Sequence, residues 1–193
     1  SAIVISLDSH IPKEHNSQRN SEKAFDVAVS AIESALAVGL YTAVSMVLSK
    51  NMLTAKKIYD FISFVGKLGA HEIRILRPMP CGKLLRDDFE QFEESDLTKL
   101  IALQYEINKN QELPTIMALP HIGAINNYGC SAGRTHVYVT ADGDVCPCDF
   151  VPLSFGNITD SSFNETYKKM SANFLNPAYG CISQMIYRDI KSV

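Results

Sequence analysis

Apolar residues in the first part of the chain follow two spacings in turn, one typical of strands and one typical of helices. Short apolar runs at residues 2–7, 42–48 and 72–76 predict buried strands. Between these runs, apolar residues recur every three or four positions, which predicts helices that face a common core. The first two helices are expected to end at Gly39 and Gly69, and a strand follows each. This order predicts right-handed βαβ units and a parallel sheet.

The three predicted helices have caps and apolar faces that can be named. The first begins after Asn20 or Ser21. The second is capped by Thr54, and the third is capped by Ser95 and runs to about Asn108. The core-facing residues are expected to be Phe25, Ala28, Val29, Ile32 and Leu36, then Ile58, Phe61, Ile62, Val65 and Leu68, then Leu97, Leu100, Ile101 and Ile107. The fold class is therefore α/β, with three βα units in the first domain.

Composition and charge narrow the class of protein. The chain has 193 residues, of which 46% are hydrophobic and 20% charged, enough for one or two small domains. A net charge of -3 and scattered basic residues give no electrostatic argument for nucleic acid as a partner. No apolar run is long enough to span a membrane, and the N-terminus lacks the basic-then-apolar order of a signal peptide. We therefore expect a cytoplasmic protein with no membrane partner.

A β-hairpin is predicted in the second half of the chain. Residues 137–140 alternate as a strand does, and residues 141–144 predict a turn in which Gly143 takes a positive φ. If the turn is centred just before Gly143, Cys148 lies opposite Val137.

Cysteines gather around this hairpin. The flexible link after Cys130 can bring that residue to the same end as Cys148, so that two thiolates share one corner. Cys146 should leave the same face of the strand, roughly 7 Å from Cys148. Cys181 follows a turn-like segment that could bring it close, whereas Cys81 is isolated in a Pro/Gly turn and is expected to have no role. Crowded cysteines in a cytoplasmic protein favour reduced or metal-bound thiols over disulfides.

This cysteine pattern resembles the auxiliary-cluster domain of radical S-adenosylmethionine (SAM) enzymes, called SPASM in its long form and Twitch in its short form. The family pattern is a cysteine, about nine to fifteen residues, a glycine, four residues and a second cysteine, which Cys130, Gly143 and Cys148 fit. The resemblance implies an auxiliary [4Fe-4S] cluster on Cys130 and Cys148, with Cys181 as a third ligand and Cys146 as a further candidate. The full SPASM run of later cysteines is absent, so the Twitch form with one cluster fits better.

Residues 5–20 (ISLDSHIPKEHNSQRN) resemble the fourth strand and following loop of the radical SAM partial barrel. The family's order there is Ser-x-Asp, then His or Asn, then Arg, and it is met by Ser6, Asp8, His15 and Arg19. Residues that follow the carboxyl ends of parallel strands face the site in such folds. The resemblance thus implies that Ser6 and Arg19, and also Asp8, lie near bound SAM.

The resemblance extends over nearly the whole chain, because residues 75–83 (ILRPMPCGK) are similar to the end of strand six. It implies three βα units of a partial (βα)6 barrel in residues 1–119 and a small SPASM/Twitch-like domain of hairpin and helix in residues 120–193. The catalytic cluster of the family is held by a C-x-x-x-C-x-x-C spacing, which this sequence does not contain. We therefore expect the C-terminal portion of a longer enzyme, inactive by itself and without catalytic residues of its own.

The resemblance implies an oxidoreductase or maturase in which SAM, cleaved at a catalytic [4Fe-4S] cluster, yields a 5′-deoxyadenosyl radical that abstracts hydrogen from substrate. The substrate is expected to be a peptide or a small molecule such as a tetrapyrrole or cofactor precursor, with ferredoxin or flavodoxin as reductant. A second hypothesis is a non-catalytic zinc module, in which a tetrahedral site holds the fold. Its ligands would be Cys130, Cys146, Cys148 and Cys181.

Overall fold

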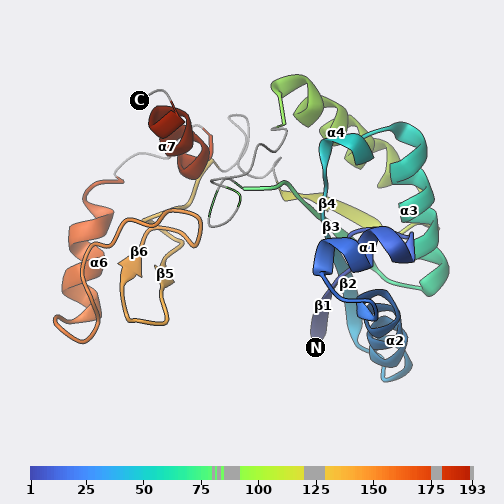
Figure 1. Cartoon of the computed structure of the whole chain (residues 1–193), viewed down its shortest axis with the longest axis horizontal. Coiled ribbons are helices and arrows are strands. Elements are labelled where there is room, and N and C mark those ends of the chain that lie inside the picture. The colour runs from blue at the N-terminus through green and yellow to red at the C-terminus, as the bar shows by residue number, and fades with distance from the viewer. Residues whose placement is uncertain (80, 82–83, 85–91, 120–128, 175–179, 192–193) are drawn as a thin grey trace. The chain divides into compact units, whose positions relative to one another are not determined.

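A computed structural model of the chain describes residues 1–79, 81, 84, 92–119, 129–174 and 180–191 (Figure 1). They fall in two units, one of residues 1–78 and 90–121 and the other of residues 79–89 and 122–193. The described residues Met79, Cys81 and Leu84 belong to the C-terminal unit. Residues 80, 82 and 83 of the stretch similar to strand six, and most of the turn expected before Cys181, lie outside the described residues.

The N-terminal unit is built on a four-stranded parallel sheet (Figure 1). Its strands, in sheet order, are β1 (Ala2–Ser6), β2 (Tyr41–Val47), β3 (Glu72–Leu76) and β4 (Thr115–Ala118). Register pairs include Ile5 with Val44, Val44 with Ile73, and Ile75 with Ala118. The predicted α/β class and parallel sheet are confirmed. β4 was not predicted, because its four residues, between Pro114 and Pro120, are too short to show a period.

Three of the helices in this unit are those that the apolar spacing predicted. They are α2 (Ala24–Ala37), α3 (Ala55–Leu68) and α4 (Glu94–Ile107), and a 3-10 turn, η1 (Lys50–Met52), precedes α3. Gly69 ends α3 in the left-handed conformation, as expected. The predicted cap of α4 was wrong by two positions, because Glu93 stands before the helix and its amide donates to the Asp96 carboxylate at 3.0 Å. That bond holds the pKa of Asp96 below its usual value.

A fourth helix, α1 (Pro12–Arg19), occupies residues that we expected to form a loop. Its residues are polar, and His15 is the buried one, so no apolar stripe marks it in the sequence. Proline at the first turn favours the start of a helix, and Asn20 ends it with φ 49°, in the left-handed region. This helix follows directly on the end of β1 and thereby positions the site described below.

The core of this unit lies between the sheet and the helices. Most predicted core-facing residues are buried there, and Val29 and Ile101 are half-buried. The largest fully buried side chains are Leu7, Ile32, Met46, Leu48, Ile58, Phe61, Ile62, Ile73, Ile75, Leu100 and Ile116. Phe25, Leu36, Leu68 and Leu97 pack against them and are partly buried. β2 and β3 are largely buried, whereas β1 is mostly exposed, contrary to the buried strand that its apolar run predicted.

The described residues of the C-terminal unit include a small antiparallel hairpin and two helices (Figure 1). The elements are β5 (Tyr138–Val139), β6 (Val145–Cys146), α6 (Phe163–Ser171) and α7 (Ile182–Lys191). Ser162 caps α6 by accepting from the Glu165 amide at 3.3 Å. Buried apolar residues of this unit include Ala132, Val145, Val151, Met170 and Tyr187. None of the described helices is both long enough and apolar enough to cross a membrane.

Candidate functional site

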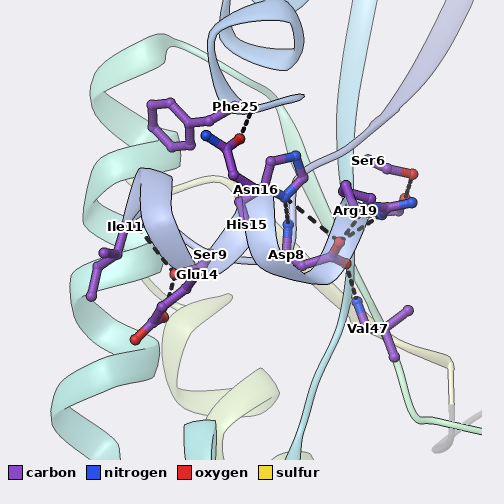
Figure 2. A network of polar contacts seen from close by, with 11 residues as sticks. Ser6, Asp8, Ser9, Ile11, Glu14, His15, Asn16, Arg19, Phe25 and Val47 are labelled. Atoms are coloured by element: carbon purple, nitrogen blue, oxygen red, sulfur yellow. Dashed lines mark hydrogen bonds and ion pairs between the residues drawn. The ribbon is translucent and has the colours of Figure 1, made fainter. Parts of the chain in front are cut away.

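A buried carboxylate organises a polar network at the carboxyl end of β1 (Figure 2). Asp8 is 4% exposed, and its Oδ1 accepts from the Val47 amide at 2.9 Å. Its Oδ2 accepts from Nε and Nη2 of Arg19, each at 2.7 Å. Both oxygens are therefore used by donors of the chain itself. Asp8 joins the end of β1 to the end of β2 and to the last turn of α1.

His15 belongs to the same network and is 2% exposed. The Asp8 amide donates to its Nδ1 at 3.1 Å, so that nitrogen carries no proton. Burial lowers the pKa of His15, and the Arg19 charge acts in the same direction, while the Asp8 carboxylate and a hydrogen bond to the Ala24 backbone oppose them. His15 is therefore neutral, and the 3.6 Å approach of Nδ1 to the Asp8 carboxylate is not an ion pair.

The three residues predicted to lie near SAM all reach this end of the sheet. Ser6 is exposed at the end of β1, and its hydroxyl lies 3.3 Å from that of Ser45 on β2. The Arg19 side chain is 39% exposed, so its guanidinium is held by Asp8 on one side and open on the other. Asp8 itself is buried and fully bonded, which gives it the role of positioning Arg19.

In the C-terminal unit, the hairpin has a register one residue away from the predicted one. Tyr138 pairs with Cys146 and Val139 with Val145, and the ladder ends there. Cys148 instead forms a bridge with Val151, so the predicted opposition to Val137 is wrong. The cause is a loop of three residues in place of two, in which the Gly143 amide donates to the Thr140 carbonyl at 3.0 Å. Gly143 has φ 90°, and this part of the prediction is confirmed.

Cys148 follows the hairpin and is half-buried. Burial raises the pKa of its thiol to about 12, helped by the Asp149 carboxylate and by the charge of Cys181. The Phe150 backbone amide donates to the sulfur and opposes that rise. Two facts follow: the sulfur has an amide donor, and Cys181 lies within electrostatic range of it.

The remaining cysteines lie in the same unit, and all five, each of which is described, are free thiols. Cys130 and Cys181 are half-buried, whereas Cys146 is 4% exposed and its pKa is raised by burial and then by Asp144. Cys81, to which the sequence analysis gave no role, also lies here. Burial and the Asp149 carboxylate raise its pKa. Its separation in sequence from the others left no signal of this grouping.

One group of three possible metal ligands stands out among the described residues. Donor atoms of His136, Cys148 and Asp149 all lie within 4.8 Å of one another. The four cysteines of the alternative zinc site do not form such a group in the described part of the chain. His136 and Asp149 were not predicted as partners of Cys148, because neither belongs to the cysteine pattern that marked the site in the sequence.

Comparisons with known proteins agree with this geometry. Residues 130–181 match the SPASM family, an iron-sulfur cluster-binding domain. The matched segment begins at Cys130 and ends at Cys181, two of the predicted ligands.

The chain also resembles whole enzymes. It is 22% identical, over 188 residues, to the AdoMet-dependent heme synthase of Methanosarcina barkeri (strain Fusaro / DSM 804), with 86% of the chain and 53% of that protein covered. The structure of Streptococcus suis SuiB bound to precursor peptide SuiA matches with a TM-score of 0.69 and 14% identity, covering 95% of the chain and 49% of SuiB. The structure of native anSMEcpe with bound AdoMet and Cp18Cys peptide matches with a TM-score of 0.60 and 19% identity. The match covers 90% of the chain and 52% of anSMEcpe. The chain spans about half the length of the curated relative it matches.

The parallel sheet and the cysteine-bearing hairpin together have the architecture of a radical SAM partial barrel followed by a SPASM-type domain. The chain is similar to radical SAM enzymes that contain a SPASM domain, so the resemblance found in the sequence is confirmed. An iron-sulfur cluster is the class of cofactor that this domain defines. The shorter Twitch form stays a prediction.

Proposed function

We propose that the chain is part of a radical SAM enzyme, in which residues 1–119 contribute to the barrel and residues 120–193 form an auxiliary-cluster domain. The environment of Cys148 carries this proposal. Its sulfur takes a hydrogen bond from the Phe150 amide and lies in electrostatic range of Cys181, and both cysteines fall inside the SPASM match. Amide donors to ligand sulfurs are a main means by which proteins tune iron-sulfur clusters.

The donor set fits an auxiliary [4Fe-4S] cluster. Cys130, Cys148 and Cys181 are free, partly buried thiols of one unit, and soft thiolates are the ligands that such clusters require. Cys146 remains a candidate for the fourth position. When bound, the cluster would accept an electron or anchor the substrate. The Phe150 amide favours the Cys148 thiolate, whereas burial acts in the opposite direction, because it disfavours the charged form of a free thiol.

Ser6 and Arg19 are the residues that we propose to contact SAM. Asp8 acts through Arg19, because its two bonds to Nε and Nη2 fix the plane of the guanidinium. The exposed side of that guanidinium keeps N–H donors that suit a carboxylate or ribose oxygen. The structures of SuiB bound to S-adenosylmethionine and of anSMEcpe with bound AdoMet support this assignment as analogies.

A peptide is the substrate class that we favour, because the similar structures of SuiB and anSMEcpe contain bound peptides. The second candidate is a haem precursor, which the curated heme synthase relative supports. Either reaction needs an electron donor such as ferredoxin or flavodoxin in the cytoplasm.

The first experiment measures iron, sulfide and zinc in the chain after anaerobic expression and purification. We expect about four irons with matching sulfide per chain. Cys148→Ser should lose most of that iron, because it removes a ligand sulfur that has its own amide donor. Cys81→Ser is the matched control: it removes a half-buried thiol of the same unit that is outside the family pattern, and should keep the iron. Unchanged iron in Cys148→Ser, or zinc in place of iron in the unmodified chain, would contradict the proposal.

A further inference from the structure

We propose that His136, Cys148 and Asp149 form a binding site for a single divalent metal ion of the borderline class, such as Fe²⁺ or Zn²⁺. The site is distinct from the cluster's ligand set, although it shares Cys148 with it. The single-ion site depends on the proposed function in one respect: the ion and the auxiliary cluster compete for Cys148.

The distances between donor atoms support one ion at this point. His136 Nε2 and Asp149 Oδ1 are 3.3 Å apart, and Cys148 Sγ and the same oxygen are also 3.3 Å apart. Ligand bonds of 2.0–2.3 Å in a tetrahedral site set donor atoms about 3.4–3.6 Å apart. Two of the three donor separations are thus close to the tetrahedral value, and the third, between His136 and Cys148, is no more than 4.8 Å.

Two segments of the backbone, one before β5 and one after β6, bring the three donor atoms together. His136 precedes β5 and Cys148 follows β6, so both lie just beyond the same end of the hairpin, and Asp149 is the next residue along the chain. The side chains of His136 and Asp149 are 48% and 44% exposed, so an ion can reach them from solvent. Without an ion, the Cys148 thiol donates to Asp149. Bound to an ion, the thiolate and the carboxylate together balance a charge of +2.

The chemistry of the three donors selects the class of ion. Imidazole and thiolate favour Fe²⁺, Co²⁺ and Zn²⁺, whereas Mg²⁺ and Ca²⁺ prefer sites made of oxygen ligands. Three protein ligands leave a fourth position open to water, as in zinc sites that are not purely structural.

The same distances exclude these three residues as ligands to separate irons of a cluster. Each protein ligand of a cubane binds a different iron, so its donor atoms diverge around the cluster, while these donors converge on one point. Because both states use Cys148, the single ion and the cluster cannot occupy the chain together. The single ion and the cluster therefore compete for Cys148.

Anaerobic titration of the metal-free chain with Co²⁺ tests the site, because thiolate-bound cobalt absorbs in the near ultraviolet and visible ranges. We expect about one Co²⁺ per chain. His136→Ala and Asp149→Asn should each weaken cobalt binding about tenfold or more, since each removes a ligand. Both side chains are largely exposed, so these variants should fold. Cys148→Ala should abolish the absorption.

Cluster content separates this proposal from the proposed function. Cys130→Ala should lose the cluster and keep the cobalt site, while His136→Ala should keep about four irons and lose cobalt. Cobalt binding that needs Cys130 or Cys181 but not His136 and Asp149 would overturn the single-ion site, as would no cobalt binding at all. If the unmodified chain assembles no cluster, the proposed function fails while the cobalt result still decides this inference.

Discussion

The carboxylates of Asp8 and Asp149 each lie beside a histidine, one in each unit, but they are held in opposite ways. Asp8 is buried, and its oxygens accept from an arginine and from a strand amide that the fold holds in place. Asp149 is exposed, and its neighbours are a thiol and an imidazole. Arg19 of the chain itself balances the charge of Asp8. Asp149 accepts a hydrogen bond from the Cys148 thiol, and in the proposed site a metal ion replaces that proton.

This difference separates a structural carboxylate from one available for binding. A buried carboxylate with all its acceptor positions used contributes to folding and orients its partner. An exposed carboxylate beside a thiol contributes little to the free energy of folding, and its oxygens can bind a ligand. Both carboxylates can be tested by the same substitution.

Asp8→Ala should have the largest effect on stability. It leaves the Val47 amide and the Arg19 guanidinium without their partner, and we expect a loss of about 2–4 kcal/mol in the free energy of unfolding. The measurement is urea unfolding followed by circular dichroism. Asp149→Ala is the matched control and should change stability by no more than about 0.5 kcal/mol. Equal losses of unfolding free energy in the two variants would show that Asp149 is as important to the fold as Asp8.

Gly143→Ala should have an intermediate effect, because this residue sets the hairpin register. Its φ is 90°, and an added Cβ would lie 2.8 Å from Oδ1 of Asn157. We expect the free energy of unfolding to fall by about 2 kcal/mol, and cobalt binding at His136 and Cys148 to weaken. Gly39→Ala is the control, since Gly39 also has positive φ but open space around it, and should cost about 1 kcal/mol. Equal cobalt affinity in Gly143→Ala and in the unmodified chain would show that the cobalt site does not depend on the turn at Gly143.

The smallest expected effect is a pH dependence from His15. Burial lowers its pKa from 6.5, so the unfolded chain binds more protons than the folded chain as the pH falls below that value. Its contribution to stability is present above pH 6.5 and is lost as the pH falls toward the folded-state pKa.

His15→Asn removes this titration while its Oδ1 can still accept from the Asp8 amide. Unfolding curves between about pH 7 and pH 5 should therefore be less pH-dependent in the variant than in the unmodified chain. Parallel pH dependence in the two proteins would show that His15 is not the group responsible.

Much of the N-terminal unit could be predicted because its signals are local. Three strands and three helices carry apolar periods that are long enough to recognise, and most core residues of the helices, β2 and β3 are buried as expected. The first strand, β1, is mostly exposed, so its predicted burial was wrong. The failures also have local causes. Helix α1 lacks an apolar stripe, β4 is too short to show a period, and Ser95 looked like a cap although the Asp96 carboxylate marks the true start of its helix.

The sequence by itself predicted a SPASM-type cysteine domain, because the spacing of Cys130, Gly143 and Cys148 is a property of the chain that needs no coordinates. It also marked Ser6, Asp8 and Arg19 as neighbours of one strand end. Only the tertiary structure decided what each side chain contacts. A hairpin loop of three residues set the pairing of Tyr138 with Cys146, and the packing of β1, β2 and α1 brought Asp8 to Arg19 and to the Val47 amide. Such contacts depend on register and packing between distant segments, which no local pattern encodes.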